Sequence, residues 1–416
     1  MNEVPTIIPK FAVAHLGSRM NYAVPRSLWE KGWLEILYTD TVCPPLFKWL
    51  NNFHFSSLKR LPSRCVPIPS DKVISFPSVN MMEIILRKFC GVGGKKLNLK
   101  VNDFFARKIL RHGLHDANAI YAFKTAALPL FKANKANTIF KILEQTSMPA
   151  EFEGKVRRQL LSEWPCWEAD VKDDWQNYYV ERENEEWELA DFILTPSDRV
   201  AEELIKNGVQ MDKIAVVPYG VDVGIGGTKT KNKNIPPLRV LMAGRISLLK
   251  GIPYLIEAAK ILPQKEYEFV LAGMLVCEKD KFLSSLPSNV KWVGHLSKSK
   301  LKEMYKWADV FCLPTFSEGS ATVVYEALAF GLPVITTPQA GSVVRDGIEG
   351  IIVDAGDAKA LADALKKLAE NPSLYSKFSE MALKRALTFA SFNAYSERLI
   401  NSINRAFCVF VDRKNK

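Results

Sequence analysis

The length, composition and charge of the chain restrict what kind of protein it is. Its 416 residues are too many for one ordinary hydrophobic core and fit two domains of about 200 residues each. A hydrophobic content of 48% and a charged content of 24% are typical of a soluble globular protein. No apolar stretch has membrane-spanning length, and the N-terminal residues lack the basic-then-apolar layout of a signal peptide.

The formal net charge of +11 is concentrated in the first third of the chain. Residues 1–140 hold about twenty Lys and Arg against about eight Asp and Glu, whereas residues 151–198 are acidic. A basic N-terminal part indicates an anionic partner, such as lipid head groups, a phosphorylated acceptor or nucleic acid, or else an ordinary solvated surface. The seven cysteines show no C-x-x-C spacing, which fits reduced thiols in a cytoplasmic protein.

The first half of the chain alternates short apolar runs with amphipathic stretches, which predicts a Rossmann-like unit of parallel strands and helices. We expect strands over residues 11–15, 34–39, 119–123, 138–143, 192–195 and 214–217, and helices over residues 25–31, 125–132, 148–164, 167–189 and 198–206. Residues 41–80 show no clear period and are expected to form loops and short helices. Gly17 lies in the turn after the first strand, where a glycine permits close backbone approach to a ligand or simply makes a tight turn.

Residues 81–113 predict two helices in which basic and apolar side chains are interleaved. Such a segment can dock on an anionic membrane, or it can pack its apolar side on the core of its own domain. The basic residues are Arg87, Lys88, Lys95, Lys96, Lys100, Arg107, Lys108 and Arg111.

The second half opens after residues 223–236, whose Gly, Thr, Lys, Asn and Pro are typical of a linker. The strand 239–243 is followed by Gly244 and Arg245, and Lys250 follows five residues later, before a helix over 252–261. Both cations come from a loop at the carboxyl end of a strand, so both can reach one diphosphate, although isolated surface cations are also normal in loops.

A βαβ unit over residues 310–337 carries two carboxylates near one helix. The strand 310–313 leads into a polar turn with Glu318, and the helix that starts near Ala321 carries Glu326. At such a strand end, beside a helix N-terminus, anionic ligands bind in parallel sheets. Glu326 lies in an apolar run, where a carboxylate needs a partner, which makes a merely solvated side chain the weaker interpretation.

The E-x7-E pair of Glu318 and Glu326, followed by EALAFGLPVI and GIIV, resembles the nucleotide-sugar-binding segment of family-4 (group 1) retaining glycosyltransferases. The Gly-Arg…Lys-Gly of residues 244–251 resembles a second signature of that family. The resemblance implies an α/β protein of the GT-B fold, in which two Rossmann-like domains with parallel sheets face a cleft. It places an acceptor-binding domain at 1–222, a linker at 223–236, a nucleotide-sugar-binding domain at 237–388 and a helix crossing back at 389–416.

The resemblance also assigns the site. Arg245, Lys250 and Glu318 are the expected catalytic residues. The expected substrate-binding residues are Gly17, Gln145, Gly244, His295, Gly319, Ser320, Ala321, Thr322, Val323 and Glu326. Two positions depart from the family pattern, because Gly17 is a single glycine and Gln145 stands where a histidine is common.

The expected reaction is retaining transfer of a sugar from a nucleotide diphosphate sugar to an acceptor hydroxyl, in polysaccharide, glycolipid or glycoconjugate synthesis. No D-x-D pair for a metal is present, so we expect no metal and no cofactor besides the donor substrate. The expected partners are the nucleotide sugar, a glycan or lipid acceptor and an anionic membrane touched from the cytoplasmic side. A nucleotide-sugar epimerase and an inactive nucleotide-sugar-binding scaffold stay open as alternatives, whereas a nucleic-acid binder rests on charge alone. The sequence does not identify the base, the sugar or the acceptor.

Overall fold

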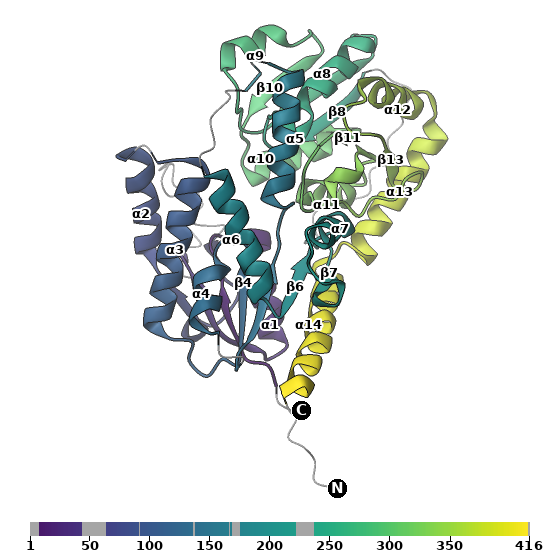
Figure 1. The fold of residues 1–416 in the computed structure, drawn as a ribbon. Helices are drawn as coiled ribbons and strands as arrows, with labels where there is room; N and C mark the ends of the chain where they lie inside the picture. The colour runs from purple at the N-terminus through teal and green to yellow at the C-terminus, as the bar shows by residue number, and fades with distance from the viewer. Residues whose placement is uncertain are drawn as a thin grey trace.

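The computed structural model describes residues 8–43, 64–90, 92–135, 138–165, 167–168, 175–221 and 237–414. Within these ranges the chain forms two parallel β-sheets, of seven and six strands, each covered by helices (Figure 1). The prediction of an α/β protein with two parallel sheets is confirmed. The predicted linker over 223–236 lies outside the described residues.

The first sheet has the strand order β3-β2-β1-β4-β5-β6-β7, and all of its neighbouring pairs are parallel. The order reverses between β1 and β4, and such a switch opens a crevice at the carboxyl edge of a sheet. The strands are β1 (Phe11–Ala14), β2 (Leu34–Thr39), β3 (Val73–Ser75), β4 (Ala119–Phe123), β5 (Phe140–Glu144), β6 (Phe192–Thr195) and β7 (Ile214–Val216). The expectation of only loops and short helices over residues 41–80 missed β3, a three-residue edge strand too short to show a period.

Seven α-helices belong to this part of the described chain. They are α1 (Ala23–Glu30), α2 (Pro77–Lys88), α3 (Gly94–His112), α4 (Ala127–Ala133), α5 (Ala150–Glu163), α6 (Gln176–Leu189) and α7 (Asp198–Lys206). The predicted helix over 167–189 begins later than expected, because Trp167 and Glu168 lie in a turn that packs on the second half of the chain.

The second sheet has the order β10-β9-β8-β11-β12-β13, again with parallel pairs. Its inner strands are almost entirely buried and mostly apolar, as expected for a sheet covered on both faces. The strands are β8 (Leu238–Ala243), β9 (Tyr267–Ala272), β10 (Val290–Gly294), β11 (Val310–Leu313), β12 (Val334–Thr336) and β13 (Gly350–Ile352). The helices are α8 (Ile252–Ile261), α9 (Lys279–Ser285), α10 (Lys298–Trp307), α11 (Thr322–Ala329), α12 (Ala358–Glu370), α13 (Pro372–Thr388) and α14 (Phe392–Lys414).

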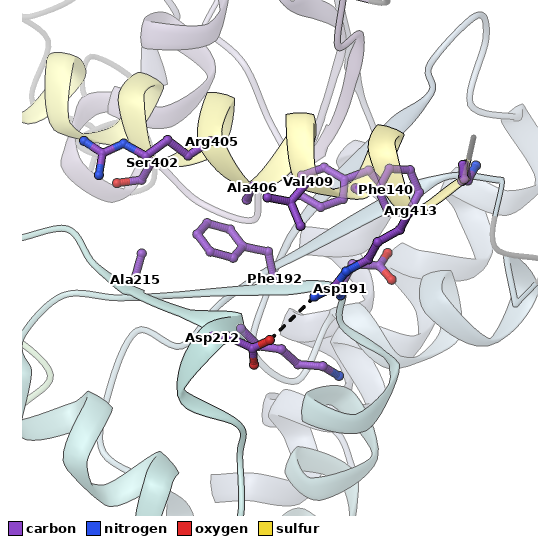
Figure 2. Close-up of a pocket in the computed structure, with 13 residues that line it drawn as sticks. Phe140, Asp191, Phe192, Asp212, Ala215, Ser402, Arg405, Ala406, Val409 and Arg413 are labelled. Atoms are coloured by element: carbon purple, nitrogen blue, oxygen red, sulfur yellow. Dashed lines mark ion pairs between the residues drawn. The ribbon is translucent and has the colours of Figure 1, made fainter. Parts of the chain in front are cut away.

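The last helix, α14, returns to the first sheet and packs along α1 (Figure 1). The ring centroids of Phe407 and Phe410 lie 5.6 and 5.0 Å from that of Phe140, at the start of β5. A hollow of about 550 Å³ lies between α14 and the starts of β5 and β6, where Arg413 pairs with Asp212 at 3.6 Å (Figure 2). This hollow is at the amino ends of the strands, the edge opposite to the predicted site.

Helix α5 comes from the first half of the sequence but contacts the second half. The hydroxyl of Tyr254, on α8, donates to Oε2 of Glu163 at 2.5 Å, and the rings of Tyr254 and Trp164 meet edge to face at 5.4 Å. The N–H of Leu248 donates to Oε1 of Glu168 at 2.5 Å. These contacts bring α5 directly against the loop that carries Lys250.

Candidate functional site

The predicted site is built from the loops that follow β8 and β11, at the carboxyl edge of the second sheet. The two loops are bonded to each other, because Phe316 N and Thr315 Oγ1 both donate to the carbonyl of Leu249, at 2.8 and 2.9 Å. This arrangement brings the ammonium of Lys250 into an ion pair with the carboxylate of Glu318. The ammonium also donates to the Ser317 carbonyl at 3.3 Å. The structure therefore unites two of the three expected catalytic residues.

Arg245, the third of them, lies two residues after β8 and is exposed. It makes no hydrogen bond or ion pair within the described part of the chain. Gly244, which precedes it, has φ of +148°, a backbone conformation that favours glycine. A guanidinium without an internal partner at this edge is available to an anionic ligand.

Glu326 lies on α11 and has found the partner that its apolar surroundings require. Its Oε2 accepts a hydrogen bond from the hydroxyl of Tyr305, on α10, at 2.8 Å. Burial raises the pKa of this carboxyl, and the Tyr305 hydrogen bond opposes that rise. No hydrogen bond or ion pair joins Glu326 to Arg245 or Lys250, so the structure does not support the interpretation that it orients those cations.

The turn before α11 is packed against the first half of the chain. A Cβ on Gly319 would lie 2.1 Å from the carbonyl oxygen of Thr146, so no other residue fits here without a shift. The Gly319 carbonyl accepts from the Ser197 hydroxyl at 2.6 Å. The turn of residues 317–320 is thus the place where the two halves of the molecule meet.

The backbone donors expected to bind a diphosphate are only partly free. Ala321 N donates to the Ala340 carbonyl at 3.1 Å, and the Ser320 hydroxyl bonds the Gly341 carbonyl at 2.8 Å. The N–H groups of Thr322 and Val323 lie in the first turn of α11, where no intrahelical partner exists. These two N–H groups are suited to an anion.

Two further predicted residues follow strands at the carboxyl edges of the two sheets. His295 follows β10 and is exposed, as suits a residue at the edge of a binding site. Gly17 follows β1 with φ of +77°, and its N–H donates to Oδ1 of Asp40 at 3.0 Å. Burial opposes ionisation of Asp40, but the hydrogen bond and charge of Arg64 lower its pKa.

Gln145 does not fit the role expected for it. Its side chain is fully buried, and its amide nitrogen donates to the Ser147 carbonyl at 3.1 Å and to Oε1 of Glu183 at 3.2 Å. Its amide oxygen accepts from the indole N–H of Trp187 at 3.0 Å. Both amide protons and the oxygen are used internally, so this structure gives no support to the interpretation of Gln145 as a residue that binds the sugar donor.

A charged cluster beside Gln145 was not predicted from the sequence. Lys124, directly after β4, forms a buried ion pair with Glu183 at 2.8 Å and donates to the Ser147 hydroxyl at 2.7 Å. Glu153, on α5, accepts from the hydroxyl of Ser317 at 3.2 Å. This contact places another carboxylate next to the Lys250–Glu318 pair. Burial raises the pKa of Glu153, and the nearby charge of Lys124 opposes that rise. The available signal was the position of Lys124 at the end of a buried strand.

A second missed group surrounds Glu144, the last residue of β5. Its carboxylate accepts from the hydroxyls of Tyr121 at 2.6 Å and Tyr219 at 3.1 Å, and Arg19 donates to the Tyr219 oxygen at 3.0 Å. Burial raises the pKa of Glu144, opposed by the charge of Arg19. This network joins the loop after β1 to the end of β5 and leaves the carboxylate without direct access to solvent.

Comparison with known proteins agrees with this geometry. Residues 228–385 match the family described as glycosyl transferases group 1. The matched region contains the whole second sheet, from β8 to β13. None of the described helices combines the length and apolar character needed to cross a bilayer, and the described residues hold no cluster of three or more metal-ligating side chains.

Several curated glycosyltransferases are similar over this region. The amylovoran biosynthesis glycosyltransferase AmsK of Erwinia amylovora is 30% identical over 193 residues, 43% of this chain and 47% of that protein. A D-inositol 3-phosphate glycosyltransferase of Paenarthrobacter aurescens is 32% identical over 215 residues, 47% of this chain and 52% of that protein. The chain therefore spans about half the length of these relatives.

Solved structures match almost the whole chain. HepE of Anabaena, in complex with UDP and glucose, has a TM-score of 0.63 at 15% identity and covers 95% of this chain and 100% of its own. The sucrose-phosphate synthase of Thermosynechococcus elongatus has a TM-score of 0.68 at 17% identity, with 96% and 100% covered. Identities this low speak for the fold alone, and the fold is GT-B, as predicted.

Proposed function

We propose that this protein is a retaining glycosyltransferase that moves a sugar from a nucleotide diphosphate sugar to an acceptor hydroxyl in polysaccharide or glycoconjugate synthesis. The observation that carries the proposal is the Lys250–Glu318 pair, held by two bonded loops at the carboxyl edge of a group 1 glycosyltransferase sheet. Relatives named for amylovoran and capsular polysaccharide synthesis support the acceptor class. HepE, which was solved with UDP-glucose, supports the donor class.

Charge development explains why these residues suit the reaction. The bond from the anomeric carbon to the diphosphate oxygen breaks, the bond to the acceptor oxygen forms, and the acceptor proton passes to the departing phosphate oxygen. Lys250, Arg245 and the N–H groups of Thr322 and Val323 stabilise the charge on the leaving diphosphate. One such charged donor lowers the activation barrier by about 3 kcal/mol, which raises the rate about a hundredfold.

The ion pair implies an exchange of partners when the donor binds. Lys250 turns from Glu318 to the diphosphate, and Glu318 becomes free to accept a hydroxyl of the sugar. The two cations make a metal unnecessary for neutralising the diphosphate.

Calorimetry with a panel of UDP-, GDP- and ADP-sugars tests the donor site. Arg245→Ala and Lys250→Ala are each expected to weaken nucleoside diphosphate binding, and EDTA is expected to leave it unchanged. Lys260→Ala, at an exposed lysine on α8 that pairs with Glu257, is the matched control. Unchanged affinity in both site variants, or complete loss of binding in EDTA, would refute the proposal.

The buried state of Gln145 favours one alternative, an inactive nucleotide-sugar-binding scaffold. Such a protein would bind the donor through Lys250 and Arg245 as proposed, but it would release no nucleoside diphosphate with any acceptor or with water. Measuring product formation alongside binding separates the two functions.

We also propose that the first half of the chain touches an anionic membrane from the cytoplasmic side, and helix α2 carries this proposal. Met81, Ile84, Ile85 and Phe89 are 61%, 51%, 46% and 80% exposed, and their spacing places the first three on one face of the helix. Arg87 and Lys88 follow in the last turn. A helix that combines an uncovered apolar face with basic residues binds at the interface of an anionic bilayer.

Helix α3 behaves differently and follows the other interpretation of this segment. Its apolar residues Leu97, Val101, Phe105 and Ile109 are buried in the core of the first sheet. The membrane proposal is therefore restricted to α2.

Co-sedimentation with liposomes tests this surface. Binding is expected to require acidic lipid, to decline with salt and to fall strongly in the double variant Ile84→Ser with Phe89→Ser. Leu387→Ser, at an apolar residue of α13 that is 53% exposed, is the control. Equal pelleting with neutral lipid, or none with either lipid, would exclude this contact.

A further inference from the structure

A crevice lies between the two halves of the molecule, beside the loop that carries Glu318. It has a volume of about 590 Å³ and is lined by the start of α7, by the loop after β12 and by α13. The crevice shares a wall with the turn of residues 317–320. The Glu318 N–H donates to the Gln339 carbonyl at 3.1 Å, and a Cβ on Gly341 would lie 2.3 Å from the Gly319 carbonyl oxygen. Because both glycines lack side chains, the wall is only a backbone thick.

The strand order shows on which side of the donor this crevice lies. Along the carboxyl edge, the loops follow one another in the order β10, β9, β8, β11 and β12. His295 lies at the β10 end, Lys250 after β8 and Glu318 after β11. Under the proposed function, a donor with its base at His295 and its diphosphate on Lys250 has its sugar near Glu318. The loop after β12 comes next, on the sugar side and away from the base. A group that occupies the crevice is therefore next to the transferred sugar, where the acceptor has to be.

One cation in the crevice lacks a carboxylate partner. The guanidinium of Arg385 donates from Nε to the Val343 carbonyl at 3.1 Å and lies 3.8 Å from the ring centroid of Phe389, and no ion pair joins it to the described carboxylates. Arg345 and Arg199 also line the crevice, but they pair with Glu349 and Glu202. Burial and the charge of Arg345 lower the pKa of Arg385, and the charge of Glu349 opposes that shift.

The other polar groups of the crevice suit hydroxyls. Oε1 of Gln339 is buried and makes no hydrogen bond with the described residues. Asp198 and Glu202 add carboxylate oxygens on the α7 side. A ligand that matches both features has one anionic group and several hydroxyl donors.

We propose that this crevice binds an acidic sugar of the acceptor, with its carboxylate or phosphate on Arg385 and its hydroxyls on Gln339, Asp198 and Glu202. The inference rests on the proposed glycosyl transfer and extends it by naming the class of acceptor. Since α7 belongs to the first half and α13 to the second, an acidic sugar bound here also contacts both sides of the cleft.

Ligand-detected NMR on the full chain tests the site with three probes at equal concentration, namely glucuronate, glucose 6-phosphate and glucose. At least one of the two acidic sugars is expected to bind about tenfold more tightly than glucose, since a charge-assisted hydrogen bond to a guanidinium is stronger than a neutral one. Comparison of the two distinguishes a carboxylate from a phosphate site, and inorganic phosphate as a competitor shows whether the anion alone is recognised.

Variants place the binding in the crevice. Arg385→Gln is expected to abolish the preference for the acidic sugar, Arg385→Lys to retain part of it, and Arg405→Gln, at an exposed arginine of α14, to leave it intact. Nucleoside diphosphate binding, measured in the same samples, is expected to be equal in all four proteins. If neither acidic sugar binds better than glucose to the wild type, or if Arg405→Gln acts like Arg385→Gln, the inference is wrong. Retained nucleotide binding would show that the donor proposal survives that outcome, whereas loss of nucleotide binding in the wild type would refute the donor proposal instead.

Discussion

The carboxyl edges of the two sheets use their charged residues in different ways. At the second sheet, Lys250 and Glu318 pair with each other but keep 17% and 26% of their side chains exposed, and Arg245 has no partner among the described residues. At the first sheet, Lys124 and Glu183 are 10% and 1% exposed and are bonded to the surrounding backbone and hydroxyls. This contrast fits the proposal that the second sheet supplies the groups that bind the ligand, while the charges of the first sheet hold its own loops in place.

The largest expected effect is the loss of stability when the buried Lys124–Glu183 pair is broken. Lys124→Met leaves the Glu183 carboxylate buried without its cation, which is expected to lower the free energy of unfolding by about 3–5 kcal/mol. Lys132→Met breaks the Lys132–Glu185 pair, whose side chains are 45% and 46% exposed, and is expected to cost less than about 1 kcal/mol. Chemical denaturation of both variants measures the difference. Equal losses would mean that the Lys124 pair is no more structural than a surface pair.

The next effect concerns turnover at the second sheet. Glu318→Gln keeps the shape of the side chain and removes its charge. Because the carboxylate is proposed to contact the sugar and not the phosphates, we expect near-normal binding of the free nucleoside diphosphate and a loss of turnover of about a hundredfold. Product formation with the donor found by calorimetry measures the rate, and Glu257→Gln, on the exposed side of α8, is the control. Transfer at the wild-type rate would remove Glu318 from the site.

The same contrast explains what could be predicted from the sequence. The strands of both sheets are mostly apolar runs bounded by turns, so most of them were predicted, and the short edge strands β3 and β13 were not. Lys250 and Glu318 carry a spacing signature within short stretches of chain, which is why their neighbourhood was expected. Because both lie in loops after adjacent strands of a parallel sheet, local sequence was enough to bring them together.

The first-sheet edge had no such local signal. The partners of Gln145 come from α6, about forty residues further along the chain, and those of Glu144 from Tyr121 and Tyr219. The contact of Glu153 with Ser317 joins residues 164 positions apart. Such pairs depend on how whole elements pack, so a polar residue at the end of a buried strand can be recognised as unusual while its partner cannot be named.

A smaller effect is the dependence of stability on pH that arises from a buried, neutral histidine at the first sheet. His15, after β1, is fully buried, neither ring nitrogen has a hydrogen-bond partner among the described residues, and burial lowers its pKa to about 3. An unfolded histidine titrates near pH 6.5, so protonation favours the unfolded chain and stability is lost as the pH falls below that value. Between pH 8 and pH 5 this loss amounts to about 2 kcal/mol.

His15→Phe removes this titration and keeps a ring between Tyr22 and Phe123. Glu186 acts in the opposite sense, because burial raises its pKa to about 7 and its stabilising effect is lost as the pH rises through that value. The quantity to measure is therefore the difference between variant and wild type in denaturation at pH 8 and at pH 5. The variant is expected to lose about 2 kcal/mol less than the wild type over that interval. Parallel pH profiles would show that His15 is not held neutral.

The smallest effect asks whether Glu326 belongs to the exposed ligand-binding edge or to the structural class seen at the first sheet. Its carboxylate is mostly buried and bonded to Tyr305, as a structural group would be, yet its place on α11 suits contact with the ribose of the donor. Glu326→Gln is expected to weaken nucleotide binding.

Tyr305→Phe removes only the hydroxyl that orients the carboxylate, a hydrogen bond of about 1 kcal/mol, and should therefore weaken nucleoside diphosphate binding about fivefold. Tyr254→Phe, which removes a hydroxyl bonded to Glu163, is the matched control, and calorimetry and denaturation are measured on all three variants. If Tyr305→Phe lowers stability by that amount but leaves the affinity unchanged, the Tyr305–Glu326 bond only fixes α10 to α11, and the second sheet, like the first, uses part of its carboxylates for its own structure.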